Sequence, residues 1–244
     1  MAILKSFLQA KNENIKRMSK NKTLKKDTLK WICDTAKYKY TYNFTWLGRP
    51  IIQFPQDILA LQEIIWEVKP DLIIETGIAH GGSLIFSSSM LKLLNNNGVV
   101  VGIDIDIRKH NRVEIEGHPL YEGITLLEGS SIDEAIFKTV KNIAKKKKNV
   151  MVFLDSNHTH NHVLRELELY STLVTKNSYI VVFDTIIEDM PKGPFLNRPW
   201  SRGNNPKTAT VSFLRKNNNF IVDKTIENKL LITVAPGGYL KRIK

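Results

Sequence analysis

The chain has 244 residues, of which 42% are hydrophobic and 25% are charged, and it carries a formal net charge of +12. A chain of this length can bury one sizeable core without covalent staples, and its single cysteine, Cys33, excludes an internal disulfide framework and fits a reducing compartment. No apolar run approaches the ~20 residues of a membrane span, and the N-terminus lacks a signal-peptide pattern, so we expect a cytoplasmic protein.

The lysines are unevenly distributed and gather between Lys5 and Lys39, in Lys145–Lys148 and in Lys241–Lys244. A strongly basic chain suggests a nucleic-acid partner, but no helix-turn-helix, zinc or RNA-recognition motif accompanies these clusters. We therefore expect no nucleic-acid partner. The clusters are typical of solvated faces or of weak attraction to acidic partners, including a peripheral contact with an anionic glycolipid.

Residues 1–45 are predicted to form a basic, helical and peripheral extension, and residues 46–244 to form one α/β domain. Thr45–Pro55 leads into that domain and is punctuated by glycine and proline. Apolar residues then recur at helical spacing on one face, and Pro70 ends the helix: Ile58, Leu61, Ile64, Ile65 and Val68.

From residue 72 onward, short β-branched runs alternate with helical ones, which is the pattern of parallel βαβ units. The expected strands are Leu72–Thr76, Val99–Asp104, Ile124–Leu127, Val150–Asp155 and Tyr179–Asp184. The expected helices lie near Ser83–Leu94, Ile132–Ala144 and His162–Val174. Two further strands, Phe220–Val222 and Leu230–Val234, are predicted to form an antiparallel pair. The fold class is therefore a Rossmann-like, doubly wound, mostly parallel seven-stranded sheet with an antiparallel C-terminal pair.

The first of these strands ends in Glu75-Thr76-Gly77 and continues into a loop with adjacent glycines, Gly81 and Gly82. Such glycines allow a ligand to approach backbone N–H groups closely. The dinucleotide pattern GxGxxG is absent, and the Glu75 carboxylate would repel a pyrophosphate but could serve a ligand that carries an ammonium group. A glycine-rich turn without function is the alternative.

The next two strand ends extend this cofactor site. Asp104 ends the second strand, where a carboxylate accepts hydrogen bonds from both ribose hydroxyls, while Asp106 lies further on and is expected to face solvent. The third strand leads into a polar turn at Ser130 that could recognise an adenine edge. A plain helix cap by Ser131, with Glu134 in the capping-box position, explains that turn equally well.

Carboxylates also end the fourth and fifth strands, at Asp155 and Asp184. Two carboxylates at adjacent strand ends suit Mg²⁺, which would chelate neighbouring sugar hydroxyls and lower the pKa of the one to be modified. Of three nearby histidines, His158 lies three residues after Asp155 and is the candidate general base. His160 and His162 are expected to be hydrogen-bonded or exposed, because no cysteine supports a zinc site.

The segment Glu188–Lys207 is long, rich in proline and glycine, and aperiodic, which is typical of a binding loop. Trp200 offers a stacking face for a sugar ring. The loop also offers contacts for hydroxyl or phosphate groups: Arg198, Arg202, Asn204 and Asn205. A surface loop without function is the alternative.

Six segments between about Trp46 and the C-terminus resemble the cephalosporin hydroxylase/rhamnosyl O-methyltransferase family: ETGIAHGGS, VVGIDIDIR, LEGSSID, VFLDSNHTHNHVLREL, VVFDT and RGNNPKTA. The resemblance implies the fold of class I S-adenosylmethionine-dependent methyltransferases. It implies that Asp155 and Asp184 hold a metal and that the following residues line the cofactor: Glu75, Gly77, His80, Gly81, Ser83, Asp104 and Ser130.

The reaction end is also similar to the catechol O-methyltransferase pattern, in which a catalytic lysine stands at the position of His158 and an asparagine at that of Thr185. Antibiotic-pathway members of the resembled family have Glu-Asp at the end of the fifth strand, where this chain has Phe183-Asp184. The missing carboxylate implies a weaker metal site, or one that recruits Thr185 or His158 instead.

These observations predict an S-adenosylmethionine-dependent, Mg²⁺-assisted O-methyltransferase that acts on a sugar hydroxyl of a glycan or glycolipid precursor. We also expect a homo-oligomer. A hydroxylase or oxidoreductase, as the family label suggests, would need a flavin, iron or nicotinamide pattern that the sequence lacks. A non-catalytic glycan-assembly protein is the remaining alternative, and Phe183 is the residue that favours it.

Overall fold

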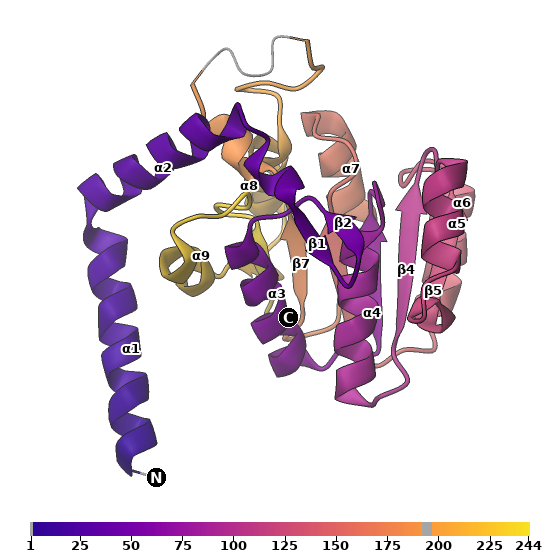
Figure 1. Ribbon diagram of the computed structural model, residues 1–244, viewed down its shortest axis with the longest axis horizontal. Helices are drawn as coiled ribbons and strands as arrows, with labels where there is room; N and C mark the ends of the chain where they lie inside the picture. Colours follow the sequence, from indigo (N-terminus) through magenta and orange to yellow (C-terminus); the bar gives the residue numbers. More distant parts are fainter. Residues whose placement is uncertain (1, 192–196) are drawn as a thin grey trace.

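The computed structural model describes residues 2–191 and 197–244. Its main sheet has seven strands in the order β5-β4-β3-β6-β7-β9-β8 (Figure 1). The strands are β3 (Leu72–Thr76), β4 (Val99–Asp104), β5 (Ile124–Glu128), β6 (Val150–Leu154), β7 (Tyr179–Val182), β8 (Phe220–Val222) and β9 (Tyr239–Arg242). Strands β3 to β7 pair in parallel, whereas β9 runs antiparallel to both β7 and β8.

Helices cover both faces of this sheet, so its central strands are apolar on both sides. Along β3, Ile73 packs into one core and Leu72 and Ile74 into the other, as the alternation of side chains along a strand requires. The first core receives α3 (Pro55–Val68), α4 (Gly82–Leu94) and α5 (Lys109–Glu116). The second receives α6 (Glu134–Ala144), α7 (His160–Tyr170) and α8 (Pro206–Lys216).

The predicted doubly wound sheet and its five parallel strands are confirmed, but the prediction of a strand at Leu230–Val234 is wrong. Helix α9 (Lys224–Leu230) ends where that strand was expected to begin, and Asp223 caps this helix by accepting a hydrogen bond from Thr225 N. The last strand is β9, further along the chain. Helices α5 and α8 were not predicted.

A buried carboxylate explains why the segment after α9 is not a strand. Asp57 on α3 is fully buried and accepts hydrogen bonds from Val234 N at 2.9 Å and from the hydroxyls of Tyr239, at 2.6 Å, and Thr233. Burial raises the pKa of Asp57 to about 6, although these hydrogen bonds oppose the shift. The segment therefore pairs with a side chain of α3 instead of a sheet edge.

The N-terminal part begins with α1 (Ala2–Lys20), which projects from the sheet domain and contacts α9, and it continues through α2 (Lys22–Ala36) (Figure 1). The 3-10 helix η1 (Tyr40–Asn43) and the hairpin of β1 (Phe44–Trp46) and β2 (Arg49–Ile51) then lead to α3. Buried Ile32 packs with Phe54, Ile186 and Met190, which fixes the end of α2 against the sheet domain. None of the helices in the described ranges is long and apolar enough to cross a membrane.

Candidate active site

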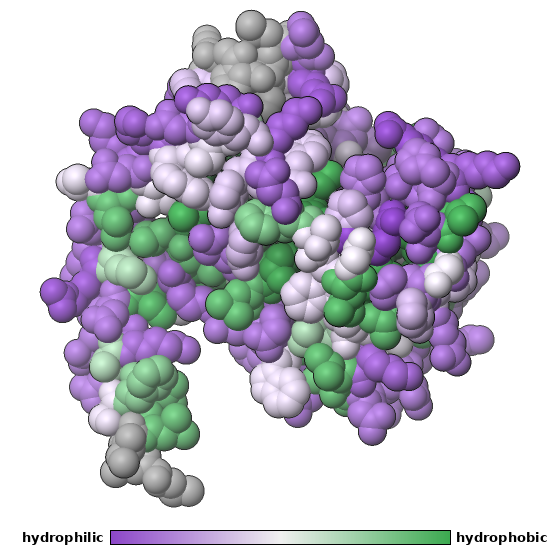
Figure 2. Space-filling view, in the orientation of Figure 1, coloured by the Kyte–Doolittle hydropathy of each residue, from purple (hydrophilic) through white to green (hydrophobic). Residues whose placement is uncertain are grey.

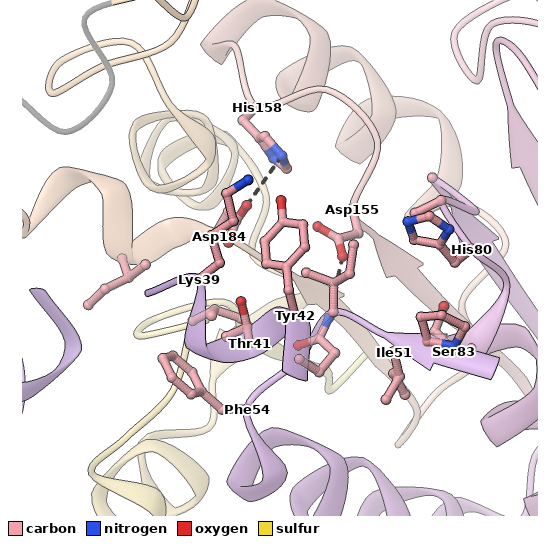
Figure 3. Close-up of a pocket in the computed structure, with 18 of the residues that line it drawn as sticks. Lys39, Thr41, Tyr42, Ile51, Phe54, His80, Ser83, Asp155, His158 and Asp184 are labelled. Atoms are coloured by element: carbon pink, nitrogen blue, oxygen red, sulfur yellow. Dashed lines mark hydrogen bonds and ion pairs between the residues drawn. The ribbon is translucent and has the colours of Figure 1, made fainter. Parts of the chain in front are cut away.

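A cavity of about 720 Å³ opens at the carboxyl ends of β3, β4, β6 and β7. This is the edge at which parallel α/β sheets bind ligands. Residues within 32–42 and 50–54 and the loops after the strands line it (Figure 3). Arg198, Trp200 and Val234 also belong to the lining. The cavity therefore joins the predicted cofactor loop, the predicted metal ligands and part of the predicted binding loop.

The loop after β3 is held between the two neighbouring strands. Gly77 N donates a hydrogen bond to Ile103 O at 2.8 Å, and Asp104 Oδ2 accepts one from Ile78 N at 2.7 Å. Gly77 has φ +88°, and a Cβ there would lie 2.2 Å from the carbonyl oxygen of Asp155. Only glycine fits this crossing, because both its conformation and its contact exclude a side chain.

Glu75 lies near the end of β3, just before this loop, and is 3% exposed. Ser83 Oγ donates to its Oε1, but Oε2 is buried and has no hydrogen-bond partner within residues 2–191 and 197–244. Burial raises the pKa of Glu75 to about 8, and the Ser83 hydrogen bond partly opposes this. The carboxyl borders a small cavity beside the main one, together with Gln53, Phe153 and Phe183.

Some of the other predicted cofactor residues line the main cavity, and some do not. His80, Ser83 and Asp104 line the main cavity. Gly81 precedes α4 with φ +82° and packs toward Ile115, and neither Gly81 nor Ser130 is among the lining residues. The alternative prediction that Ser131 caps the helix after the Ser130 turn is wrong. Asp133 caps α6 instead, by accepting hydrogen bonds from Ala135 N and Ile136 N.

At the reaction end, Asp155, His158 and Asp184 each offer one ligand atom, and these atoms lie within 4.8 Å of one another. His158 Nε2 lies 3.2 Å from Asp184 Oδ2 (Figure 3). Gln53 Nε2 donates to Asp155 Oδ2 at 3.3 Å. Burial and then the neighbouring Asp184 carboxylate raise the pKa of Asp155 well above its usual range. A divalent cation would relieve this repulsion, and two carboxylates are suitable ligands for Mg²⁺.

Asp184 also has an unusual backbone conformation. Asp184 adopts φ +54°, an uncommon conformation for a non-glycine residue, at the start of η3 (Thr185–Glu188). Thr185 is fully buried and donates to Pro236 O at 2.9 Å, so it does not replace the missing carboxylate. Phe183 packs edge-on against Phe153, and it is His158 that occupies the third corner of the cluster.

The expectation that His160 and His162 are hydrogen-bonded is confirmed. His160 Nδ1 lies 2.8 Å from Thr208 Oγ1, and His162 Nε2 lies 3.0 Å from Ser131 Oγ. Buried Glu166 accepts a hydrogen bond from Ser131 Oγ at 2.6 Å. These residues tie α7 to its neighbours and leave His158 as the histidine of this group at the cluster.

The described part of the predicted binding loop contributes three residues to the cavity, Met190, Arg198 and Trp200. The Trp200 ring meets His158 edge-on at 4.7 Å between centroids, and the Arg198 guanidinium lies 5.2 Å from the Trp200 ring centre. The other three predicted ligands have different contacts. Arg202 pairs with Glu188 at 3.9 Å, Asn204 Oδ1 accepts from His160 N, and fully buried Asn205 caps α8. Residues 192–196 of this loop lie outside the described residues.

A family model described as Rhamnosyl O-methyltransferase/CmcI matches residues 38–243. The chain belongs to this family. Rhamnosyl O-methyltransferases of Mycobacterium tuberculosis H37Rv and Mycobacterium leprae are 28% and 26% identical to it over 200 residues. These alignments cover 81% of this chain and 78% and 82% of the relatives.

Solved structures share the fold of this family member. CmcI-D160 with Mg and S-adenosylmethionine superposes with a TM-score of 0.59 and 20% identity, covering 83% of this chain and 78% of CmcI. The O-methyltransferase TomG from Streptomyces achromogenes gives 0.55 and 14%, covering 92% of each chain. Class I methyltransferases therefore have the same architecture as this Rhamnosyl O-methyltransferase/CmcI family member.

The sequence pattern did not identify the cavity-lining residues that precede the main sheet in the chain. Lys39 and Tyr42 line the cavity from a segment that was expected to be peripheral, and Gln53 reaches Asp155 from the linker before α3. No motif surrounds these residues. Their positions depend on packing between segments far apart in the sequence. The apolar residues of α2, which pack this segment against the sheet domain, were the one feature of the sequence that could have indicated it.

Proposed function

We propose that this chain is an S-adenosylmethionine-dependent O-methyltransferase that acts on a sugar hydroxyl of a glycan or glycolipid precursor. The observation that carries the proposal is one cavity that is lined by the glycine loop, by Asp104 at the end of β4 and by the Asp155–His158–Asp184 cluster. Such an enzyme must hold a methyl donor beside a polarised acceptor hydroxyl, and proximity supplies much of the rate.

The cofactor would lie along the loop after β3. Gly77 lines the cavity. The Oε2 atom of Glu75, which has no hydrogen-bond partner among the described residues, borders the adjoining small cavity and is an acceptor suited to an ammonium group. Asp104 has one carboxylate oxygen on the loop backbone and lines the cavity, where it can accept from ribose hydroxyls. We assign His80 and Ser83 to the same end of the cavity. Gly81 and Ser130 stay predicted cofactor residues that act through the shape of their turns.

Asp155 and Asp184 would hold Mg²⁺, which lowers the pKa of a chelated hydroxyl when it is bound. His158, fixed between Asp184 and the edge of Trp200, takes the proton of the acceptor hydroxyl. The acceptor oxygen forms its bond to the methyl carbon as the carbon–sulfur bond breaks. Trp200 offers a face to the sugar ring, and Arg198 lies beside it. We assign the metal to Asp155 and Asp184 and not to His158, so that the imidazole stays free to act as the base.

Calorimetric titration of S-adenosylmethionine into Asp104→Ala and into Asp106→Ala tests the cofactor assignment. Asp104 holds the loop and faces the cavity, whereas Asp106 is exposed, which makes it a matched control. We expect affinity to fall at least about tenfold in Asp104→Ala only, as expected for loss of hydrogen bonds to a ribose. Wild-type protein that does not bind S-adenosylmethionine would contradict the proposal.

We further propose that the extension of residues 1–45 contacts an anionic glycolipid surface and that the domain of residues 46–244 carries the catalysis in the cytoplasm. The projecting part of α1 exposes Leu4, Phe7 and Leu8 beside Lys5 and Lys11, and Figure 2 shows this hydrophobic patch among hydrophilic neighbours. Co-sedimentation with anionic and with neutral vesicles tests the contact, and equal binding to both would contradict it. The proposed homo-oligomer is tested by light scattering.

A further inference from the structure

The wall of the cavity opposite the cofactor loop comes from the segment that follows α2. Aromatic packing seats this segment, because the Tyr40 ring lies 5.0 Å from Trp31, 5.2 Å from Phe44 and 6.0 Å from Phe54. Tyr40 packs against the cluster of Ile32 and Phe54, and Lys39 and Tyr42 line the cavity on either side of it. Figure 3 shows both residues at the same opening as the Asp155–His158–Asp184 cluster.

Two of the cations that line the cavity, Lys39 and Arg198, have no ion-pair partner in the part of the chain that the structure describes. Basic residues nearby are neutralised: Lys207 pairs with Asp189 at 2.5 Å, and Arg202 pairs with Glu188. A third lining cation, Arg108, precedes α5 beside the Asp104 strand end and therefore belongs to the cofactor side.

Each of these two cations lies over an aromatic ring that also lines the cavity. Lys39 Nζ lies 5.9 Å from the Tyr42 ring centre, and Arg198 lies 5.2 Å from that of Trp200. The rim therefore carries two aromatic rings for an apolar sugar face and two positive charges that form no ion pair with the described residues. A neutral acceptor would leave both charges unused, whereas an anionic group would be attracted over a Debye length of ~10 Å.

We propose that Lys39 and Arg198 select an acceptor that carries a phosphate or carboxylate group next to the sugar to be methylated. This inference rests on the proposed methyl transfer and names its substrate class. The segment before the sheet domain thereby determines acceptor specificity, through Lys39, while the strand ends hold the cofactor. Lys39→Gln and Arg198→Gln remove one charge each, and Lys39→Glu reverses one.

The test compares the affinities of methyl rhamnoside, rhamnose 1-phosphate and methyl glucuronoside by calorimetry, with S-adenosylhomocysteine present. We expect at least one anionic probe to bind about tenfold more tightly than the neutral glycoside, with an advantage that shrinks as salt rises. The preferred probe distinguishes phosphate from carboxylate. Each Gln variant should reduce the advantage about threefold or more, and Lys39→Glu should abolish it.

Lys37→Gln is the matched control, because Lys37 is an exposed lysine two residues away that lies over Tyr38 and does not line the cavity. It should leave all three affinities unchanged. Equal affinity for neutral and anionic probes, or equal losses in the Lys37 and Lys39 variants, would overturn the inference. Binding of S-adenosylhomocysteine is measured first, because its failure would refute the proposed function, whereas its success with no anion preference refutes only this inference.

Discussion

Gly77→Ala places a methyl group where two strand ends cross, and its effect can be derived from the structure. The new Cβ would lie 2.2 Å from the Asp155 carbonyl oxygen and 2.6 Å from its carbon, and both are backbone atoms that no side-chain rotation can move. To reach ordinary contact, the end of β6 must shift by about 1 Å, which is enough to misplace a catalytic group. The Asp155 carboxylate would move with it and separate from Asp184.

Two costs add in this variant. A non-glycine residue at φ +88° costs ~1–2 kcal/mol, and the overpacked crossing adds ~1–3 kcal/mol, so the free energy of unfolding should fall by roughly 2–5 kcal/mol. Turnover should fall about 100-fold from the misplaced carboxylate. Urea denaturation and initial rates of methyl transfer measure the two effects separately.

Gly48→Ala is the control for backbone strain. Gly48 has φ +87°, nearly the same conformation, but a Cβ there meets no atom within 4 Å. It should lose only ~1–2 kcal/mol of stability and retain full turnover. If Gly77→Ala behaves like Gly48→Ala in both assays, the reasoning that this crossing positions Asp155 is refuted.

Three further predictions concern two buried carboxyl groups and the proposed base His158. The pKa of Glu75 is about 8 in the folded protein and 4.5 ordinarily, so its contribution to stability is complete below about pH 4.5 and is lost as pH rises through 8, by up to roughly 5 kcal/mol. Glu75→Gln should flatten this fall in urea denaturation, and an unchanged pH profile would contradict the assignment. Asp57→Ala leaves three donors unpaired and should cost roughly 3–5 kcal/mol, whereas exposed Asp34→Ala should leave the melting temperature unchanged. His158→Asp should bind Mg²⁺ at least as tightly in calorimetry but reduce turnover ~10²–10⁴-fold, and retained turnover would exclude His158 as the base.

The sheet could be predicted because its parallel strands carry local signals. Runs such as Leu72–Thr76 and Val150–Leu154 are almost wholly apolar, as strands buried on both faces are, and polar residues follow each of them. The C-terminal part has no such signal. Strand β9 is only four residues long and ends in Lys241 and Arg242, while the apolar run before it is held by Asp57 of α3. A short strand with basic residues cannot be told from a loop by its pattern alone.

The residues of the site also fall into those that the sequence predicts and those that it does not. Asp155, His158 and Asp184 follow strands at one sheet edge, so their meeting follows from topology. The contributions of Lys39, Tyr42 and Gln53 depend on how α2 and η1 pack on the sheet domain, which the sequence pattern does not encode locally. Asn205 shows the converse, because a polar loop residue that was expected to bind substrate is used as a helix cap.

The most direct test of the central claim is mass spectrometry of a sugar acceptor incubated with methyl-labelled S-adenosylmethionine and Mg²⁺, using wild-type protein and Asp155→Ala. We predict that the acceptor gains one labelled methyl group with wild-type protein. The variant should bind S-adenosylmethionine with unchanged affinity and transfer no methyl group, because Asp155 belongs to the reaction-end cluster. Equal labelling by wild-type and variant, or no labelling of any glycan acceptor by wild-type protein that binds the cofactor, would contradict the account.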